Sequence, residues 1–165
     1  ILWYRSPLGK KIGAANVDAG ADPLEMQRYA SVLQLDPPTS NRMGLIQQLE
    51  EQTATTARTV QMLFSVVMSL YKGFTAAGLI LPSPPPDFEK TFKGQVSESL
   101  RRAITLSMLF KYRSISDNEL AGYLAFLKSP SAVAFNTSVW SGMNASLSDA
   151  AQVLGRNLAE IKLGQ

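Results

Sequence analysis

Apolar residues recur at spacings of three and four along most of this sequence, and this periodicity constrains the fold more than any other feature. The clearest run forms one continuous seam: Leu49, Thr53, Thr56, Val60, Leu63, Val67, Leu70 and Phe74. Such spacing places all of its members on one face of an α-helix. The sequence has no alternating apolar run closed by an Asn-Gly or Asp-Gly turn, so no strand is predicted. We therefore predict an all-α protein, a bundle of about six helices, two of them longer than thirty residues.

Proline residues divide this helical pattern into segments. Ser6-Pro7 and Asp22-Pro23 each place Pro at a first helical position, behind a side chain that can cap the free backbone N–H groups. The Pro37-Pro38 pair ends the helix that begins at Pro23, because the residue before a proline avoids the α region. Ser129-Pro130 starts the last helix in the same way as Ser6-Pro7.

The seam lies in what we predict to be the longest helix, capped by Thr39 or Ser40. Its second half, 62–71, is apolar nearly all round and is expected to be central in the fold. The segment 60–81 is long enough to cross a bilayer. Lys72 and several hydroxyl side chains interrupt this segment, so a helix in the core of a bundle is the preferred interpretation.

The proline-rich segment 82–86 ends this helix and forms a stiff connector. A helix is predicted after it at about 87–112, and a capping box from Ser116 to Glu119 begins another. We expect two helical halves, 1–81 and 87–165, which pack as one domain.

The absence of histidine and cysteine limits the chemistry that this chain can perform. Disulfides, thiolate metal sites and catalysis by His or Cys are all excluded. The local carboxylate pairs are Glu50-Glu51, Asp87/Glu89 and Asp117/Glu119, whose spacings do not bring two side chains face to face on a helix. We predict that the protein is not an enzyme and uses no cofactor or metal. A hydrolase that relies on carboxylates is the weaker alternative.

The charge distribution argues against nucleic acid as a partner. The net charge is +3, and the 16 basic residues are spread along the chain, with Lys10-Lys11 and Arg101-Arg102 as the longest runs. Nucleic-acid-binding proteins usually carry a denser basic stripe with aromatic side chains between the charges. A mildly basic surface is the simpler interpretation.

One phrase occurs twice in the sequence. LWYRSPLGKKI at residues 2–12 and AFLKSPSAVAF at residues 125–135 both contain an aromatic residue, a basic residue, Ser-Pro and then a small residue. We interpret each copy as a joint, in which a helix stops, Ser caps the next helix and Pro restarts the chain. A small residue just past the Pro allows two helices to approach closely. The residues of this structural motif are Ser6, Pro7, Gly9, Phe126, Lys128, Ser129 and Pro130, and they predict an internal repeat of helix–Ser-Pro–helix units.

LWYRSPLGKKI, together with SDNELAGYLAFLKSP at residues 116–130, resembles the bacterial family called domain of unknown function 2059. The hallmark of that family is an aromatic pair, a basic or polar residue, Ser-Pro, and Gly-Lys or Gly-Gln. The resemblance covers roughly 1–20 and 90–150, and the second copy departs from it with Ser131-Ala132 in place of Leu-Gly. It implies an exported helical protein of the periplasm whose signal peptide is not in the chain, and it supplies no catalytic residue. Because about forty residues of helical sequence precede the second copy of the phrase and none precede the first, we expect Ile1 to be a cut edge within a longer protein.

Two candidate sites follow from the residues. The first is an exposed interaction patch with the aromatic and basic composition of a binding hot spot: Trp3, Tyr4, Arg5, Lys10 and Lys11. The preferred interpretation of Trp3, as of Trp140, is nevertheless an anchor of the core. The second is an apolar cavity between helices, since Met-rich surfaces repack around varied ligands: Met62, Phe64, Val66, Met68 and Tyr71.

These sites correspond to two functional hypotheses. The leading hypothesis is a non-catalytic helical protein of the bacterial envelope that binds a protein partner or associates with itself. The alternative is a carrier of a lipid or another apolar ligand, for which a membrane surface is a further candidate partner.

Overall fold

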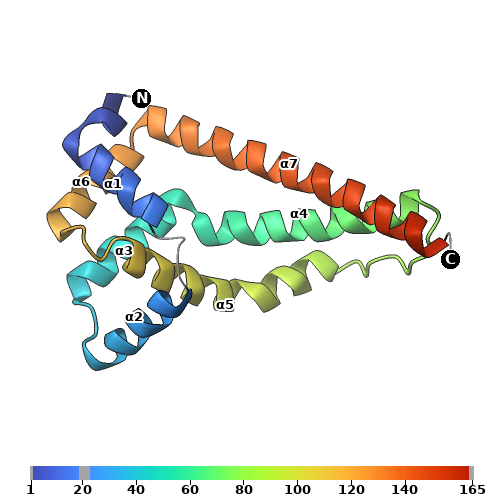
Figure 1. The fold of residues 1–165 in the computed structure, drawn as a ribbon, viewed down its shortest axis with the longest axis horizontal. Helices are drawn as coiled ribbons and strands as arrows, with labels where there is room; N and C mark the ends of the chain where they lie inside the picture. The colour runs from blue at the N-terminus through green and yellow to red at the C-terminus, as the bar shows by residue number, and fades with distance from the viewer. Residues whose placement is uncertain (1, 19–22, 164–165) are drawn as a thin grey trace. The chain divides into compact units, whose positions relative to one another are not determined.

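The protein is described by a computed structural model of residues 2–18 and 23–163 (Figure 1). These residues form one short 3-10 helix and seven α-helices, with no strand among them, which confirms the all-α prediction. The elements are η1 (Leu2–Arg5), α1 (Pro7–Asp18), α2 (Pro23–Leu35), α3 (Ser40–Thr53), α4 (Thr55–Ala76), α5 (Phe88–Lys111), α6 (Asp117–Leu127) and α7 (Pro130–Leu163). Among the described helices, none combines the length and the hydropathy needed to span a bilayer.

The helices begin where the sequence places capping residues. Thr39 accepts a hydrogen bond from a backbone N–H of the first turn of α3, at 3.1 Å. At the start of α6 the capping box is complete, because Ser116 Oγ accepts from the Glu119 N–H and the Glu119 carboxylate accepts from the Ser116 N–H. Asp22, the predicted cap of α2, lies outside the described residues. The prolines predicted to stand first in their helices do so: Pro7, Pro23 and Pro130.

The helix predicted to be the longest is interrupted at Ala54. This residue has φ 49° and ψ 35°, the left-handed conformation, so α3 ends before it and α4 begins after it. The hydroxyl of Thr53 hydrogen-bonds the carbonyl of Leu49 at 2.8 Å and lies 2.7 Å from the hydroxyl of Thr55. β-Branched residues with competing hydroxyls weaken a helix, whereas the apolar spacing continues unchanged across the break. The prediction of one continuous helix was therefore wrong, and α7, with 34 residues, is the only described helix longer than thirty.

The contacts within the chain divide it into two compact units. Unit 1 contains Ile1–Thr55 and Arg101–Ala134, and unit 2 contains Thr56–Leu100 and Phe135–Gln165. Helices α5 and α7 contribute residues to both units. The connector 82–86, expected between two sequence halves, lies within unit 2.

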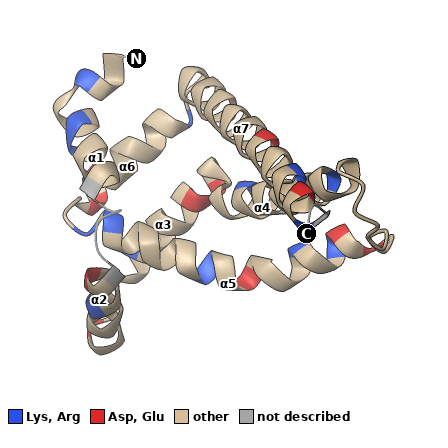
Figure 2. Cartoon of the chain, turned by 45° about the vertical axis from the view of Figure 1, so that its right-hand side comes forward, with Lys and Arg blue, Asp and Glu red and all other residues tan. Residues whose placement is uncertain are grey.

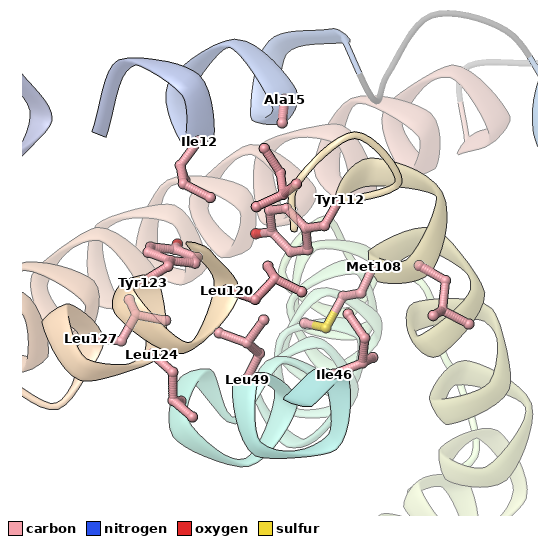
Figure 3. Packing of buried hydrophobic residues seen from close by; sticks show 12 residues of the cluster. Ile12, Ala15, Ile46, Leu49, Met108, Tyr112, Leu120, Tyr123, Leu124 and Leu127 are labelled. Carbon is pink, nitrogen blue, oxygen red and sulfur yellow. The ribbon is translucent and has the colours of Figure 1, made fainter. Parts of the chain in front are cut away.

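Unit 1 contains the main hydrophobic core, shown in Figure 3. Side chains of α1 and α3 converge there on Leu120 of α6 and on Tyr112, which follows α5. Tyr29 of α2 packs against this cluster and donates a hydrogen bond to the Leu109 carbonyl at 3.2 Å. The largest fully buried side chains all belong to it: Ile12, Ile46, Leu49, Leu120 and Leu127.

Arg42 of α3 fixes the loop between α5 and α6. Its guanidinium donates to the carbonyls of Tyr112 and Ile115 and forms an ion pair with Asp117 at 3.0 Å. The Arg42 side chain is only 14% exposed, so solvent screens these interactions less than it screens a surface pair. This arrangement holds Ser116 at the position where it caps α6.

Unit 2 consists of α4, the first half of α5 and most of α7. Rings of α4 and α5 pack together, with Phe64 about 6 Å from both Phe88 and Phe92 between ring centroids. The segment 62–71 was predicted to be central in the fold, but no residue in it is buried. That prediction was wrong because two neighbouring helices cover only part of the circumference of α4.

Helices α4 and α7 cross in close contact at a pair of glycines. A Cβ atom on Gly73 would lie 2.2 Å from the Gln152 carbonyl oxygen, and one on Gly155 would lie 2.5 Å from that of Leu70. Neither position therefore accepts a side chain. Ala151 and Ala159, one turn before and after Gly155, are also buried. At this crossing, the side of α7 that packs on α4 therefore consists of small residues.

Candidate functional site

The first copy of the repeated phrase forms a compact joint between η1 and α1. The Trp3 carbonyl accepts from the Ser6 N–H at 2.9 Å and from the Ser6 hydroxyl at 2.6 Å. The Ser6 Oγ in turn accepts from the Gly9 N–H at 3.0 Å, and the Ser6 carbonyl accepts from Lys10 at 2.9 Å. A Cβ atom on Gly9 would lie 2.2 Å from the Trp3 carbonyl oxygen, so the joint requires a glycine there.

The second copy makes the same backbone pattern between α6 and α7. The Phe126 carbonyl accepts from the Ser129 N–H at 2.9 Å, and the Ser129 Oγ accepts from the Ala132 N–H at 3.3 Å. The Ser129 carbonyl accepts from the Val133 N–H at 3.0 Å. Ala132 is buried, as Gly9 is in the first copy. Both phrases therefore stop one helix and cap the next with the same three hydrogen bonds.

The aromatic residues of the two phrases pack against each other. The rings of Trp3 and Phe126 stack with centroids 4.0 Å apart and an interplanar angle of 5°. Tyr123 stacks on Trp3 from α6 at 5.6 Å, and Tyr4 meets Phe126 edge-on. These four residues, which we call the aromatic cluster, hold the two joints together within unit 1.

The titratable groups near the joints have structural roles. Burial raises the pKa of Tyr123 to about 12 and also raises the pKa of Tyr112, so neither phenol is a base near neutral pH. The Lys11 ammonium and the backbone and hydroxyl of Ser116 hydrogen-bond the Glu119 carboxylate and lower its pKa to about 2. Glu119 is therefore a fixed anion that joins α1 to the start of α6.

The predicted interaction patch is brought together only in part. Trp3 and Tyr4 are half-buried in the aromatic cluster, whereas Arg5, Lys10 and Lys11 are exposed. The Lys11 ammonium lies 2.7 Å from the Glu119 carboxylate. The accessible part of the patch is thus basic more than aromatic, as the blue segments near the N-terminus indicate in Figure 2.

Unit 2 contains an open groove of about 400 Å³ between α4 and α7. We call it the α4–α7 groove, and it is lined by Ala57, Arg58, Gln61, Met62, Thr137, Trp140, Ser141 and Asn144. The Arg58 guanidinium lies over the Trp140 ring, 6.0 Å from its centroid, and donates to the Asn136 carbonyl at 3.3 Å. Asn144 Oδ1 is buried and has no hydrogen-bond partner among the described residues.

The residues predicted to line an apolar cavity are divided between two grooves. Met62 lines the α4–α7 groove, while Phe64 and Met68 line a neighbouring groove that also includes Gln61. Val66 and Tyr71 line neither of these grooves. The sequence reasoning missed Arg58 and Asn144, although each stands four residues from an apolar groove residue on its own helix, Met62 and Trp140 respectively.

Helix α7 exposes its apolar side. We define its outer face by six side chains, each between 40% and 62% exposed: Val139, Met143, Leu147, Leu154, Leu158 and Ile161. The sequence contains no charged residue between Lys128 and Asp149, and the first half of α7 accordingly has no red or blue segment in Figure 2. Small residues of α7 pack on α4 at the glycine crossing and Trp140 lines the α4–α7 groove, whereas the six side chains of the outer face are exposed.

Comparison with known proteins identifies no relative: no family model, no curated protein and no solved structure matches this chain. Within residues 2–18 and 23–163, no group of three or more acidic side chains is placed to hold a metal ion.

Proposed function

We propose that this protein is a non-catalytic helical protein of the bacterial envelope that acts by association with a second copy of itself through the outer face of α7. The observation that carries the proposal is the exposure of large apolar residues at helical spacing on that face. Exposed apolar patches on soluble proteins commonly mark interaction sites.

Several features of α7 favour a second copy as the occupant of this face. Leu147, Leu154 and Ile161 are spaced by seven residues, and Met143 and Ala150 each stand four residues before one of them, as at the a and d positions of a coiled coil. The uncharged stretch from 129 to 148 offers no like charges that would repel a second α7. The small residues of the helix are already used against α4.

The envelope location and family membership are part of this proposal. They rest on the resemblance of LWYRSPLGKKI and of residues 116–130 to the domain of unknown function 2059 family. The proposal that the protein is not an enzyme rests on the absence of His and Cys from the sequence and on the structural role of Glu119, which is paired with Lys11.

Sedimentation equilibrium of the full chain tests self-association. We expect the wild-type chain to dimerise, and Leu147→Glu and Leu154→Glu to shift it to the monomer, because a charge would have to be buried in the interface. Ala145→Glu, on an exposed side of α7 away from the outer face, is the matched control and should dimerise like the wild type. Circular dichroism checks that each variant remains helical. A wild-type chain that is monomeric at all concentrations would overturn the proposal.

A second candidate function is a carrier of an apolar ligand. The α4–α7 groove favours it, because its volume is in the range of about 300–1,000 Å³ typical of small-molecule sites. Met62 and Trp140 supply apolar walls, and a few polar groups converge between them.

A further inference from the structure

We infer that the α4–α7 groove binds a fatty acid, with the carboxylate at Arg58 and the hydrocarbon chain against Met62 and Trp140. This inference rests on the second candidate function and names the chemical class of its ligand. It does not depend on self-association through α7.

The charge of the groove lining favours an anionic ligand. Arg58 is the only charged side chain among the groove residues, so a bound ligand meets one positive group and no negative one. Among the described residues, the guanidinium donates to one backbone acceptor, the Asn136 carbonyl at 3.3 Å. A guanidinium has five N–H donors in a planar fork that matches a carboxylate, so donors remain for a ligand.

The position of the guanidinium is set by the protein before any ligand binds. Its contact with the Trp140 ring and its hydrogen bond to α7 hold the Arg58 side chain across the gap between α4 and α7. A cation over an aromatic ring is attracted by the electrons of that ring. A carboxylate that reaches Arg58 therefore lies beside the Trp140 indole, against which its hydrocarbon chain can pack.

A second polar group in the groove lacks a partner. Asn144 stands one turn after Trp140, and its buried Oδ1 accepts no hydrogen bond from the described residues. Buried polar side-chain atoms in folded proteins are nearly always hydrogen-bonded, so an unpaired one calls for an explanation. The two ends of an amide are interchangeable by rotation, so Asn144 can turn its NH2 group toward a carboxylate. Asn144 thus supplies a second polar group to a ligand in the groove.

The remaining wall of the groove suits a hydrocarbon chain. Ala57 and Met62 of α4 face Trp140 of α7 across it, and the surface between them is mainly apolar. Thioether side chains adapt their shape to the ligand beside them. This combination of one cation, one amide and an apolar wall matches an amphiphile with a single carboxylate.

Tryptophan quenching tests the inference directly. The chain has two tryptophans, so Trp3→Phe leaves Trp140 as the only one and keeps an aromatic ring next to Phe126. We expect 2-bromododecanoate, whose bromine is next to the carboxylate, to quench the fluorescence of Trp3→Phe in a saturable way below its micelle concentration. Trp140→Phe, which keeps only Trp3, should show no saturable quenching. The absence of saturable quenching in Trp3→Phe would overturn the inference.

A charge-removing variant tests the place of the carboxylate. In the Trp3→Phe background, Arg58→Gln should weaken the affinity for 2-bromododecanoate by about tenfold or more, as expected for loss of a charge-assisted hydrogen bond. Arg156→Gln, an exposed position of α7 outside the groove, should leave the affinity unchanged. Competition by dodecanol, which lacks the charge, should be equally strong in Arg58→Gln and in its parent. Dodecanol that competes as well as dodecanoate in the parent would retain the carrier function and overturn the carboxylate site at Arg58.

Discussion

Trp3 and Phe126 occupy the same position in two copies of one sequence phrase, and their rings stack on each other at 4.0 Å. The stacked pair joins η1, near the N-terminus, to α6. The Ser-Pro step that follows each of these residues repeats the same three hydrogen bonds. Each phrase therefore ends one helix, starts another, and supplies one half of an aromatic contact.

A double-mutant cycle should detect the coupling between these two rings. We expect Trp3→Ala and Phe126→Ala together to cost less stability than the sum of the single changes, with a coupling of about 0.5–1.5 kcal/mol. Urea unfolding provides the free energies. Leu35, which is 89% exposed, gives a control pair with Trp3 for which the effects should add. Additive effects for Trp3 and Phe126 would show that the stack contributes no specific energy.

The first joint should reject a methyl group at Gly9. Gly9→Ala places Cβ against the Trp3 carbonyl and the Tyr4 backbone, so we expect a loss of about 1–3 kcal/mol. Gly13, on the same helix, has no atom within 4 Å of a Cβ position, and Gly13→Ala should gain up to about 1 kcal/mol from helix propensity. Thermal unfolding should therefore move in opposite directions for the two variants. A gain for both would contradict the close approach.

The glycine crossing in unit 2 should behave as one structural element. Gly73→Ala and Gly155→Ala should each cost about 1–3 kcal/mol, because each methyl group drives the α4 and α7 backbones apart. The double variant should cost less than the sum, since one displacement relieves both clashes. Gly142→Ala, in open space on α7, is the control and should be neutral or stabilising. Denaturant unfolding of the four variants and the wild type provides the free energies for this comparison.

Glu119 should make stability depend on pH in the acid range. Its pKa is about 2 in the folded chain, below that of an unfolded glutamate, because Lys11 and Ser116 hydrogen-bond the carboxylate. The stabilisation is therefore complete above about pH 5 and is lost as the pH falls toward about 2. Melting temperatures measured across this range should fall less steeply for Glu119→Gln than for the wild type. Glu160→Gln, an exposed carboxylate on α7, should follow the wild-type curve.

Within the first Ser-Pro step, the serine should contribute more to the free energy of unfolding than the proline. Ser6→Ala removes a cap of α1 and a hydrogen bond to the Trp3 carbonyl, so we expect a loss of about 1–2 kcal/mol. Pro7→Ala should cost about 1 kcal/mol or less, because Pro at a first helical position acts mainly by restricting the unfolded chain. Ser6→Asp, which retains a capping oxygen, should recover part of the serine loss. A larger loss for Pro7→Ala than for Ser6→Ala would contradict this order.

Much of the helical organisation could be predicted because helix starts are local. Thr39, Ser116 and the prolines act through hydrogen bonds and dihedral restraints within a few residues, so the sequence around them is sufficient. The break at Ala54 could not be predicted from apolar spacing, because the seam continues across it. The crossing at Gly73 and Gly155 also depends on residues that are distant in sequence.

The candidate sites were harder to predict from the sequence, because they also depend on contacts between residues that are distant in sequence. Trp3 could be assigned to a patch or to the core, and only the packing of Phe126 and Tyr123 against it accounts for its half-buried state. In α7 the apolar spacing does not show which side of the helix packs on a neighbour. The side of α7 that packs on α4 is set by Gly155 and its small neighbours. Leu147 and Leu154 therefore remain exposed.

The interleaved composition of the two units has a consequence for any attempt to divide this protein. Unit 1 needs Ile1–Thr55 together with Arg101–Ala134, so every continuous fragment that contains it also contains Thr56–Leu100. A cut in the proline-rich connector would leave Ile12 and Leu49 on one piece and Leu120 on the other. Each piece would then expose half of the core of unit 1, and the two would be partners in fragment complementation, each depending on the other to fold.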